Sequence, residues 1–241
     1  MIASAQRVAA GVAALLLCAA TSAIAAPFED TMAQRVLACT GCHGPEGRAA
    51  ADGYYPRIAG KPAGYLYNQL VNFRDGRRPY ALMNDLLAPL DDAYLRAIAA
   101  HFAGLDLPYP AAIGSDISLA DRALAERLVT QGDAARGLPA CTACHGTAMT
   151  GTAPFVPGLI GLPRDYLNAQ LGAWRNGKRV AQAPDCMAEI ANKLAPEEIG
   201  RLSSWLAAQS VPVGAKPAAR FAAALPIACG GVAATTGVAP R

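Results

Sequence analysis

The chain has 241 residues, of which 53% are apolar and 16% are charged, and its formal net charge is +3 at pH 7. This apolar fraction excludes an intrinsically disordered chain, and the small charge without any basic run disfavours a nucleic-acid binder. Because 55 of the residues are Ala, which raises hydropathy but adds little core volume, the composition does not indicate a membrane protein.

The first 25 residues predict a cleaved export signal. Arg7 precedes an uncharged apolar stretch from Val8 to Ala20, and the segment ends in the A-x-A pattern Ala23-Ile24-Ala25. An apolar stretch of this length is too short for a bilayer, which needs about 20 residues, but it suits the core of a signal peptide. The alternatives are a buried N-terminal helix and a lipid anchor at Cys18.

The rest of the chain contains an internal repeat. Leu37–Gly44 recurs as Pro139–Gly146, and 10 of 23 positions are identical between 56–78 and 157–179. Two copies are too few for a solenoid, which needs at least three, so the repeat predicts two similar domains. The expected boundaries are domain one at 26–106, a Pro- and Gly-rich linker at 107–117, domain two at 118–211 and a C-terminal tail at 212–241.

Periodicity and caps predict three helices in each copy. In the first copy they cover about Thr31–Ala38, Ala63–Phe73 and a stretch that starts after Leu90 with Asp91 as N-cap, with Tyr94, Leu95, Ile98 and Phe102 on its apolar face. In the second copy they cover Leu119–Val129, Arg164–Trp174 and Pro196–Ala208. No alternating strand pattern of useful length appears, so the predicted fold class is all-α.

Two CxxCH motifs lie at corresponding positions, Cys39-Thr40-Gly41-Cys42-His43 and Cys141-Thr142-Ala143-Cys144-His145. Two thiols at this spacing can form thioethers to the two vinyl groups of one haem, and the adjacent histidine can bind the iron. A redox CxxC of the thioredoxin type needs a βαβ context, which is missing. A zinc site needs two further ligands per domain, for which only His101 and Cys186 or Cys229 are present. The motifs therefore predict two covalently bound haems of the c type.

Met83 and Met187 are the candidates for the second axial ligand of each iron. They follow their histidines by 40 and 42 residues, at equivalent places in the repeat, where a loop before the last helix is predicted. A thioether is a good soft ligand for haem iron and raises its reduction potential. One such methionine could simply fill a gap in the core, but two at equivalent positions favour ligation. Met32 and Met149 lie close to their CxxCH motifs and are weaker candidates.

The sequence resembles the dihaem class I cytochromes c of the cytochrome c4 type over about Thr31–Gln209. The resemblance is carried by ACTGCHGPEG at 38–47, PRIAGKPAGYLYNQL at 56–70, FRDGRR at 73–78 and their counterparts in the second copy. It implies two all-α cytochrome domains related by pseudo-twofold symmetry, with one His/Met-ligated haem in each. It also implies an electron carrier in the bacterial periplasm.

The resemblance further implies roles for single residues. Pro56 and Pro157 look like the prolines whose carbonyl accepts a hydrogen bond from the histidine bound to the iron, which fixes the ring and tunes the metal. The aromatic residues would pack near the haems or serve as plain helix core; they are Tyr65, Phe73, Tyr166 and Trp174.

The chain departs from the family pattern around Cys186. Three extra residues precede Met187 relative to the first copy, and a tail from Pro212 onward carries Cys229. In an oxidising compartment the two remaining cysteines can pair, so we expect a Cys186–Cys229 disulfide that ties the tail to the second methionine segment. The alternatives are two free thiols, or a Cys186 thiolate that replaces Met187 as ligand.

Outer-sphere electron transfer is the expected function, with no catalytic residue and with both irons six-coordinate. The expected partners are redox proteins, namely a membrane oxidase, a cytochrome bc1-type complex or a periplasmic dehydrogenase, and membrane association would occur only through such a partner. One alternative is a cytochrome subunit of a dehydrogenase, with the tail as docking element. Another is a dihaem enzyme acting on a small sulfur anion or peroxide, which would need an open iron position or a catalytic thiolate such as that of Cys186.

Overall fold

The computed structural model describes residues 29–50, 53–112, 114 and 117–232. The predicted export signal at 1–25 lies outside the described residues. The chain divides into a segment Met1–Thr31 and one compact unit, Met32–Arg241, which contains both copies of the repeat. The elements below all belong to this second unit.

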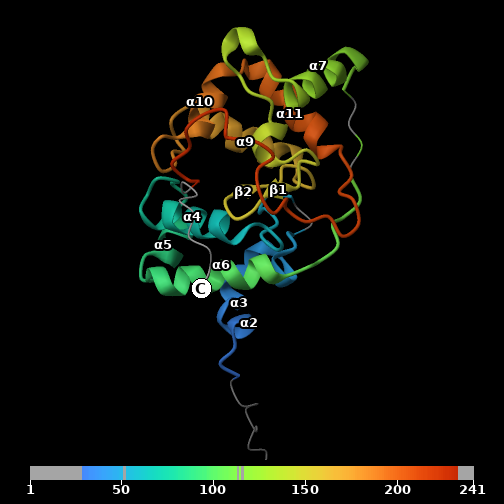
Figure 1. Ribbon diagram of the computed structural model, residues 1–241. Coiled ribbons are helices and arrows are strands. Elements are labelled where there is room, and N and C mark those ends of the chain that lie inside the picture. Colours follow the sequence, from blue (N-terminus) through green and yellow to red (C-terminus); the bar gives the residue numbers. More distant parts are fainter. Residues whose placement is uncertain (1–28, 51–52, 113, 115–116, 233–241) are drawn as a thin grey trace, which may run out of the picture. The chain divides into compact units, whose positions relative to one another are not determined.

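The first copy is a group of helices in which α4 packs against α6 (Figure 1). Its elements are α2 (Met32–Arg35), α3 (Leu37–His43), the 3-10 turn η1 (Pro45–Gly47), α4 (Ala63–Arg74), α5 (Ala81–Leu87) and α6 (Asp92–Gly104). The prediction of Asp91 as a cap is confirmed, because its side chain accepts a hydrogen bond from the backbone N–H of Tyr94 at 2.7 Å. The helix predicted at Thr31–Ala38 is instead divided into α2 and α3, since Val36 departs from helical geometry between them.

In the second copy, α7 and α9 both pack against α11. Its elements are α7 (Leu119–Thr130), the 3-10 turn η2 (Ala134–Arg136), α8 (Thr142–His145), β1 (Gly151–Thr152), β2 (Val156–Pro157), α9 (Arg164–Arg175), α10 (Cys186–Lys193) and α11 (Pro196–Ala207). The three helices predicted here are present, with ends that differ from the prediction by one residue at most.

A small β-hairpin was not expected. In this antiparallel pair, Gly151 lies opposite Pro157 and Thr152 lies opposite Val156. Strands of two residues are too short to produce the alternation by which a strand is recognised in a sequence. The fold is still mainly helical, but the second copy contains a hairpin that the alternation of apolar and polar residues in the sequence did not predict.

Met83 and Met187 lie on the short helices α5 and α10 rather than in the predicted loops, which corrects that expectation. A side-chain hydrogen bond is present at the start of each of these helices and satisfies a backbone N–H group that a helix start leaves unpaired. Asn84 accepts a hydrogen bond from the N–H of Tyr80 at 2.6 Å. Asp185 accepts one from an N–H in the first turn of α10 at 3.0 Å.

Each copy has its own apolar core. The buried residues of the first are Val36, Leu66, Leu87, Leu95, Ile98, Ala99 and Phe102. Three of these form the predicted apolar face of α6, and Tyr94 packs against them. The second core is built from α7, α9 and α11 and includes Met149, which is only 4% exposed. Met149 therefore has a packing role.

The predicted linker at 107–117 packs against the first copy where it is described. Arg57 donates hydrogen bonds to the carbonyls of Leu107 at 2.5 Å and Pro108 at 3.0 Å. Its guanidinium also lies 4.0 Å from the ring centroid of Tyr109. These contacts give the start of the linker a defined path.

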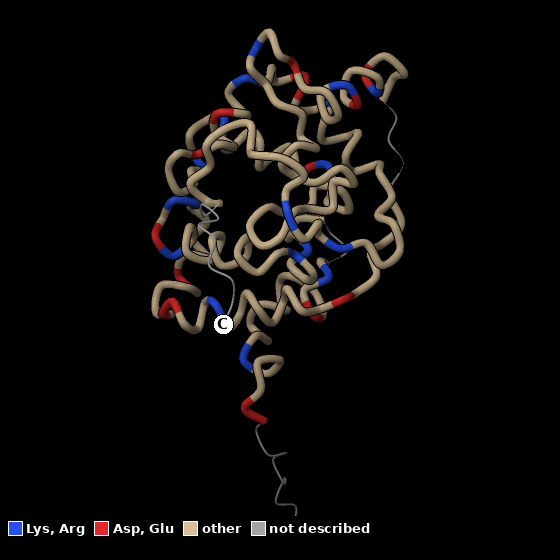
Figure 2. The backbone as a smooth tube through the Cα atoms, in the orientation of Figure 1, with Lys and Arg blue, Asp and Glu red and all other residues tan. Residues whose placement is uncertain are grey.

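Charged residues are spread along both copies (Figure 2). Ion pairs such as Arg74–Asp92 at 2.8 Å and Lys193–Glu189 at 2.7 Å join several of them at the surface. Exposed pairs of this kind contribute little stability, so the two apolar cores matter more for the fold. None of the helices in the described part of the chain has both the length and the apolarity that a bilayer crossing requires.

Candidate functional site

The CxxCH motifs lie on α3 and α8, at corresponding places in the two copies. On α3, Cys39 and Cys42 are three residues apart, which places both thiols on the same side of the helix. α8 begins directly after Cys141 and ends at His145, so the second motif is helical as well. The four motif cysteines form no disulfide. Each motif therefore presents two thiols and an adjacent imidazole.

A proline carbonyl holds the ring of each motif histidine. The Nδ1 atom of His43 lies 2.8 Å from the oxygen of Pro56, and the Nδ1 atom of His145 lies 2.7 Å from the oxygen of Pro157. A carbonyl only accepts hydrogen bonds, so Nδ1 carries the proton and the lone pair of Nε2 remains for a metal. Burial lowers the pKa of both histidines, and the bonds to the prolines oppose this in part. The neutral ring is thus the favoured form.

Three of the four motif thiols, those of Cys39, Cys141 and Cys144, are not poised for redox catalysis. Burial raises the pKa of Cys39 and Cys144, and it raises the pKa of Cys141 to about 11. Reactive thiols instead have a pKa below that of free cysteine. A zinc site would need Cys186 or Cys229 as a further ligand, but these two cysteines are bonded to each other in a disulfide. The described residues contain no group of three or more His, Cys, Asp or Glu side chains that could hold a metal ion.

A cavity of about 2090 Å³ is lined by both CxxCH motifs and by Met83 and Met187. Small-molecule sites usually have roughly 300–1,000 Å³, so this cavity has room for more than one large group. The aromatic residues expected near a haem also line it; they are Tyr65, Phe73, Tyr166 and Trp174. A thiol pair, an imidazole, a thioether and apolar walls from each copy fit two haems.

A symmetric set of hydrogen bonds joins the two copies at this cavity. Arg78 donates to Gln69 of its own copy at 3.1 Å, and to Gln170 and Tyr166 of the other copy at 2.7 and 3.1 Å. Arg179 donates to Gln170 at 2.6 Å and to Gln69 at 2.7 Å. The arginines and glutamines are identical in the two copies of the repeat, and this identity is the feature of the sequence that marks them, although no role was predicted for them.

This arginine cluster, formed by Arg78 and Arg179, has no acidic partner among the described residues. Burial and then the charge of Arg78 lower the pKa of Arg179 to about 10. Arg179 lies 3.7 Å from the ring centroid of Trp174, whose buried Nε1 has no hydrogen-bond partner in the described part of the chain. A buried and a half-buried cation together with an unpaired donor fit an anionic acceptor in the cavity, such as the carboxylates of a haem.

Lys61 is a further cation that the sequence analysis missed. It stands where the second copy has Leu162, and it is only 4% exposed. Its Nζ donates to the carbonyl of Gly158 at 3.2 Å, and burial lowers its pKa to about 8. Its charge also lowers the pKa of His145. The first copy thus places a positive charge close to the histidine of the second.

No family model matches the chain. Several known proteins are nevertheless similar to it in sequence and in fold. The chain is 37% identical to the thiosulfate dehydrogenase electron acceptor of Stutzerimonas stutzeri, over 82% of this chain and 92% of that protein. It is 34% identical to cytochrome c4 of Pseudomonas aeruginosa, over 80% of this chain and 94% of that protein. The crystal structure of reduced recombinant cytochrome c4 from Pseudomonas stutzeri matches it with a TM-score of 0.63 and 30% identity, covering 74% of this chain and 96% of that one. The chain therefore belongs to the cytochrome c4 family, the electron-transfer proteins that carry two covalent haems c with histidine and methionine as axial ligands.

Proposed function

We propose that each copy of the repeat binds one haem with its own residues. In the first copy they are Cys39, Cys42, His43 and Met83, and in the second they are Cys141, Cys144, His145 and Met187. The observation that carries this proposal is that all eight side chains line the same cavity although they come from four separate segments of the chain. The thiols would form the thioethers, and the imidazole and thioether groups would occupy the two axial positions.

A bound haem iron supplies one-electron chemistry between Fe(III) and Fe(II). The histidine and methionine of each copy would hold the iron from both sides, which would leave no position for a substrate. Pro56 and Pro157 fix the orientation of the histidine rings. The apolar walls exclude water and favour the less charged, reduced state. Arg78 and Arg179 would hold haem carboxylates, and their charge favours the reduced state further.

The proposed electron donor is a thiosulfate dehydrogenase, since one relative is named as the electron acceptor of that enzyme. The chain would pass the electrons to an oxidase or to another redox protein. It would act as a carrier rather than an enzyme, because the Cys186 thiolate that a sulfur-oxidising site could use is taken up in the bond to Cys229.

The proposed location is the periplasm, with residues 1–25 removed as a signal peptide. A disulfide is typical of such an oxidising compartment, which supports this placement. The proposed organisation keeps the boundaries stated above, namely domains at 26–106 and 118–211, a linker at 107–117 and a tail at 212–241.

Mass spectrometry and spectroelectrochemistry of the mature protein test this proposal. We expect a chain that starts after Ala25 with two haem additions, two methionine–iron charge-transfer bands and two one-electron steps. On rapid mixing, a thiosulfate dehydrogenase with thiosulfate should reduce both haems, whereas thiosulfate alone should reduce neither. A single haem, or turnover of thiosulfate by the protein alone, would contradict the proposal.

Replacing Met83 by histidine should lower the potential of the first haem by on the order of 0.1–0.3 V, within the ~0.8 V range that axial ligands span. One of the two methionine–iron bands should disappear, and Met187→His should remove the other. Met32→Leu is the matched control, because Met32 packs against the first core and should not bind iron. Bands that persist in either histidine variant would show that the ligand is a different residue.

Replacing Lys61 by methionine should lower the potential of the second haem by roughly 50 mV, the effect of one unit charge at about 15 Å with an effective dielectric constant near 20. The sign follows because a nearby positive charge disfavours Fe(III). Lys216→Met is the control, since Lys216 is exposed and paired with Asp106 at 2.6 Å, and it should cause little change.

Lys61 should also make the reduction potential of the second haem depend on pH. The pKa of Lys61 is about 8, so its ammonium group is charged below that pH and neutral above it. The potential of the second haem should therefore fall as the pH rises through about 8, and this step should be missing in Lys61→Met. A step that persists in the variant would have to be assigned to another group.

A further inference from the structure

The two methionine helices are fastened to the protein in different ways. In the first copy, the residue after Met83 is Asn84, whose side-chain amide donates a hydrogen bond to the carbonyl of Phe73 at the end of α4. Its oxygen accepts from the N–H of Tyr80 at 2.6 Å. Asn84 thus ties α5, and with it Met83, to the neighbouring long helix.

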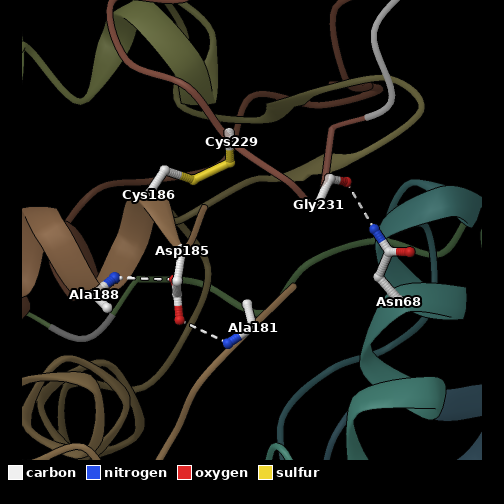
Figure 3. The surroundings of a disulfide bond; sticks show 7 residues. All are labelled: Asn68, Ala181, Asp185, Cys186, Ala188, Cys229 and Gly231. Carbon is white, nitrogen blue, oxygen red and sulfur yellow. Dashed lines mark hydrogen bonds between the residues drawn. A yellow bond between two sulfur atoms is a disulfide. The ribbon is translucent and has the colours of Figure 1, made fainter. Parts of the chain in front are cut away.

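This tie is missing in the second copy. The residue after Met187 is Ala188, which has no side-chain hydrogen-bonding group, although Trp174 stands where the first copy has Phe73. Asp185 accepts hydrogen bonds from the N–H groups of Ala181 at 2.6 Å and Ala188 at 3.0 Å (Figure 3). Those bonds cap α10 within its own segment, but they do not fasten it to α9.

A disulfide stands next to Met187 instead. Cys186 is the first residue of α10 and is bonded to Cys229 in the tail, with a Cα–Cα distance of 4.9 Å (Figure 3). The following residue, Gly230, donates its N–H to the carbonyl of Pro184 at 2.9 Å. A side chain at Gly230 would collide with the backbone of Ala183, so the tail can approach this closely only with glycine there.

The tail is itself anchored on both sides of this bond. Upstream, Ala218 pairs with β1, donating to Gly151 at 2.9 Å and accepting from Ala153 at 2.7 Å. Downstream, the carbonyl of Gly231 accepts a hydrogen bond from the side chain of Asn68 on α4 at 2.7 Å. The tail therefore connects the start of α10 to fixed points in both copies. Its side chains also reach the cavity; Leu225, Ile227 and Val232 line it.

We propose that the Cys186–Cys229 disulfide and its tail segment position Met187 as the axial ligand of the second haem, in place of the asparagine tie of the first copy. This inference rests on the proposed function, in which Met187 binds the iron. Cys186 and Cys229 are positioning residues that act through the helix carrying Met187.

Imidazole binding to the ferric holoprotein tests the proposal, because added imidazole enters only when a methionine leaves the iron. In the double variant Cys186→Ser/Cys229→Ser, imidazole should bind the second haem about tenfold faster or more, since a disulfide constrains a segment more strongly than one hydrogen bond. The first haem should keep its wild-type rate and serves as an internal control. The methionine methyl resonances in the NMR spectrum assign each phase to its haem.

Two further variants make the test symmetrical. Asn84→Ala should speed imidazole binding at the first haem and leave the second unchanged. Ala188→Asn, added to the serine double variant, should restore slow binding at the second haem, because it recreates the lost tie. If the serine double variant does not assemble, the Asn84→Ala protein, whose disulfide is intact, must still show exchange accelerated at the first haem alone.

Rates at the second haem within about twofold of the wild type in the serine double variant, or no acceleration in Asn84→Ala, would overturn the inference. Such a result would leave the proposed function intact, provided that the wild type shows two methionine–iron bands. A wild type that lacks the second band would instead refute the assignment of Met187, and the inference with it.

Discussion

Replacing Cys39 and Cys42 together by alanine will prevent the first copy of the repeat from folding. In the proposed function these two thiols attach the haem of this half, and the haem would fill a large part of its core. Among the described residues, the apolar core of this copy has seven buried members. The half-buried residues that pack against it, among them Leu70 and Phe73, face the cavity.

The size of the cavity decides the magnitude of this effect. The cavity is shared by both haem sites, so the loss of one haem leaves about half of its 2090 Å³ unfilled, which at about 24 cal/mol per Å³ would cost on the order of 25 kcal/mol. That exceeds the ~5–15 kcal/mol by which a whole domain is stable. The walls would therefore collapse rather than stay in place, and α4, α5 and α6 would lose the surface against which they pack.

Circular dichroism, limited proteolysis and the haem-to-protein ratio measure the result. We expect one haem per chain, a helical signal reduced by about the share of the first copy, and rapid cleavage within residues 32–104. Thr40→Ala is the matched control, because it alters the motif between the cysteines and removes a hydrogen bond to the carbonyl of Leu37 at 3.0 Å but keeps both thiols. A haem-free first copy with native helicity would contradict the prediction.

The parts of this structure that could be predicted are those set by local pattern. The helices at 63–74 and 164–175 follow from apolar periodicity and from the proline before each of them. Asp91 is recognisable as a cap because its side chain accepts a hydrogen bond from the backbone N–H of Tyr94, which is only three residues further along the chain. The Cys186–Cys229 bond followed from a count, since these are the two cysteines that remain after the export signal and the motifs are set aside.

The parts that could not be predicted depend on contacts between distant residues. Arg78 and Gln170 are 92 positions apart, and Lys61 and Gly158 are 97 apart. No periodicity within either copy indicates that these side chains meet, because the contact depends on how the copies pack together. The helix around Met83 was missed for a different reason, since it is only seven residues long and its N-cap residue, Tyr80, provides no side-chain cap that could be recognised in the sequence.

Replacing both Arg78 and Arg179 by glutamine will lower the potentials of both haems, each by on the order of 200 mV for the two charges together. Each guanidinium donates to glutamines of both copies, so the two charges lie between the two sites rather than within one. A unit charge at about 8 Å with an effective dielectric constant near 20 contributes about 2 kcal/mol, or roughly 90 mV for one electron. Removing positive charge favours Fe(III), which gives the sign.

The adjacent residue Arg77 provides the matched control. Arg77→Gln makes the same change in charge at the next position, but Arg77 is paired with Asp75 at 2.9 Å and both are partly exposed. Solvent and the carboxylate already screen that charge, so its loss should change either potential by no more than roughly 10 mV. The control separates the effect of cations that line the cavity between the two haem sites from that of net charge.

The single variants discriminate between a shared cluster and two separate sites. Because the hydrogen bonds cross between the copies, Arg78→Gln alone and Arg179→Gln alone should each lower both potentials. If each arginine served only the haem of its own copy, each single variant would shift one potential and leave the other in place. Redox titration of the two single variants therefore measures whether each arginine affects the potentials of both haems. A shared effect would show that the two haems are electrostatically coupled through this cluster.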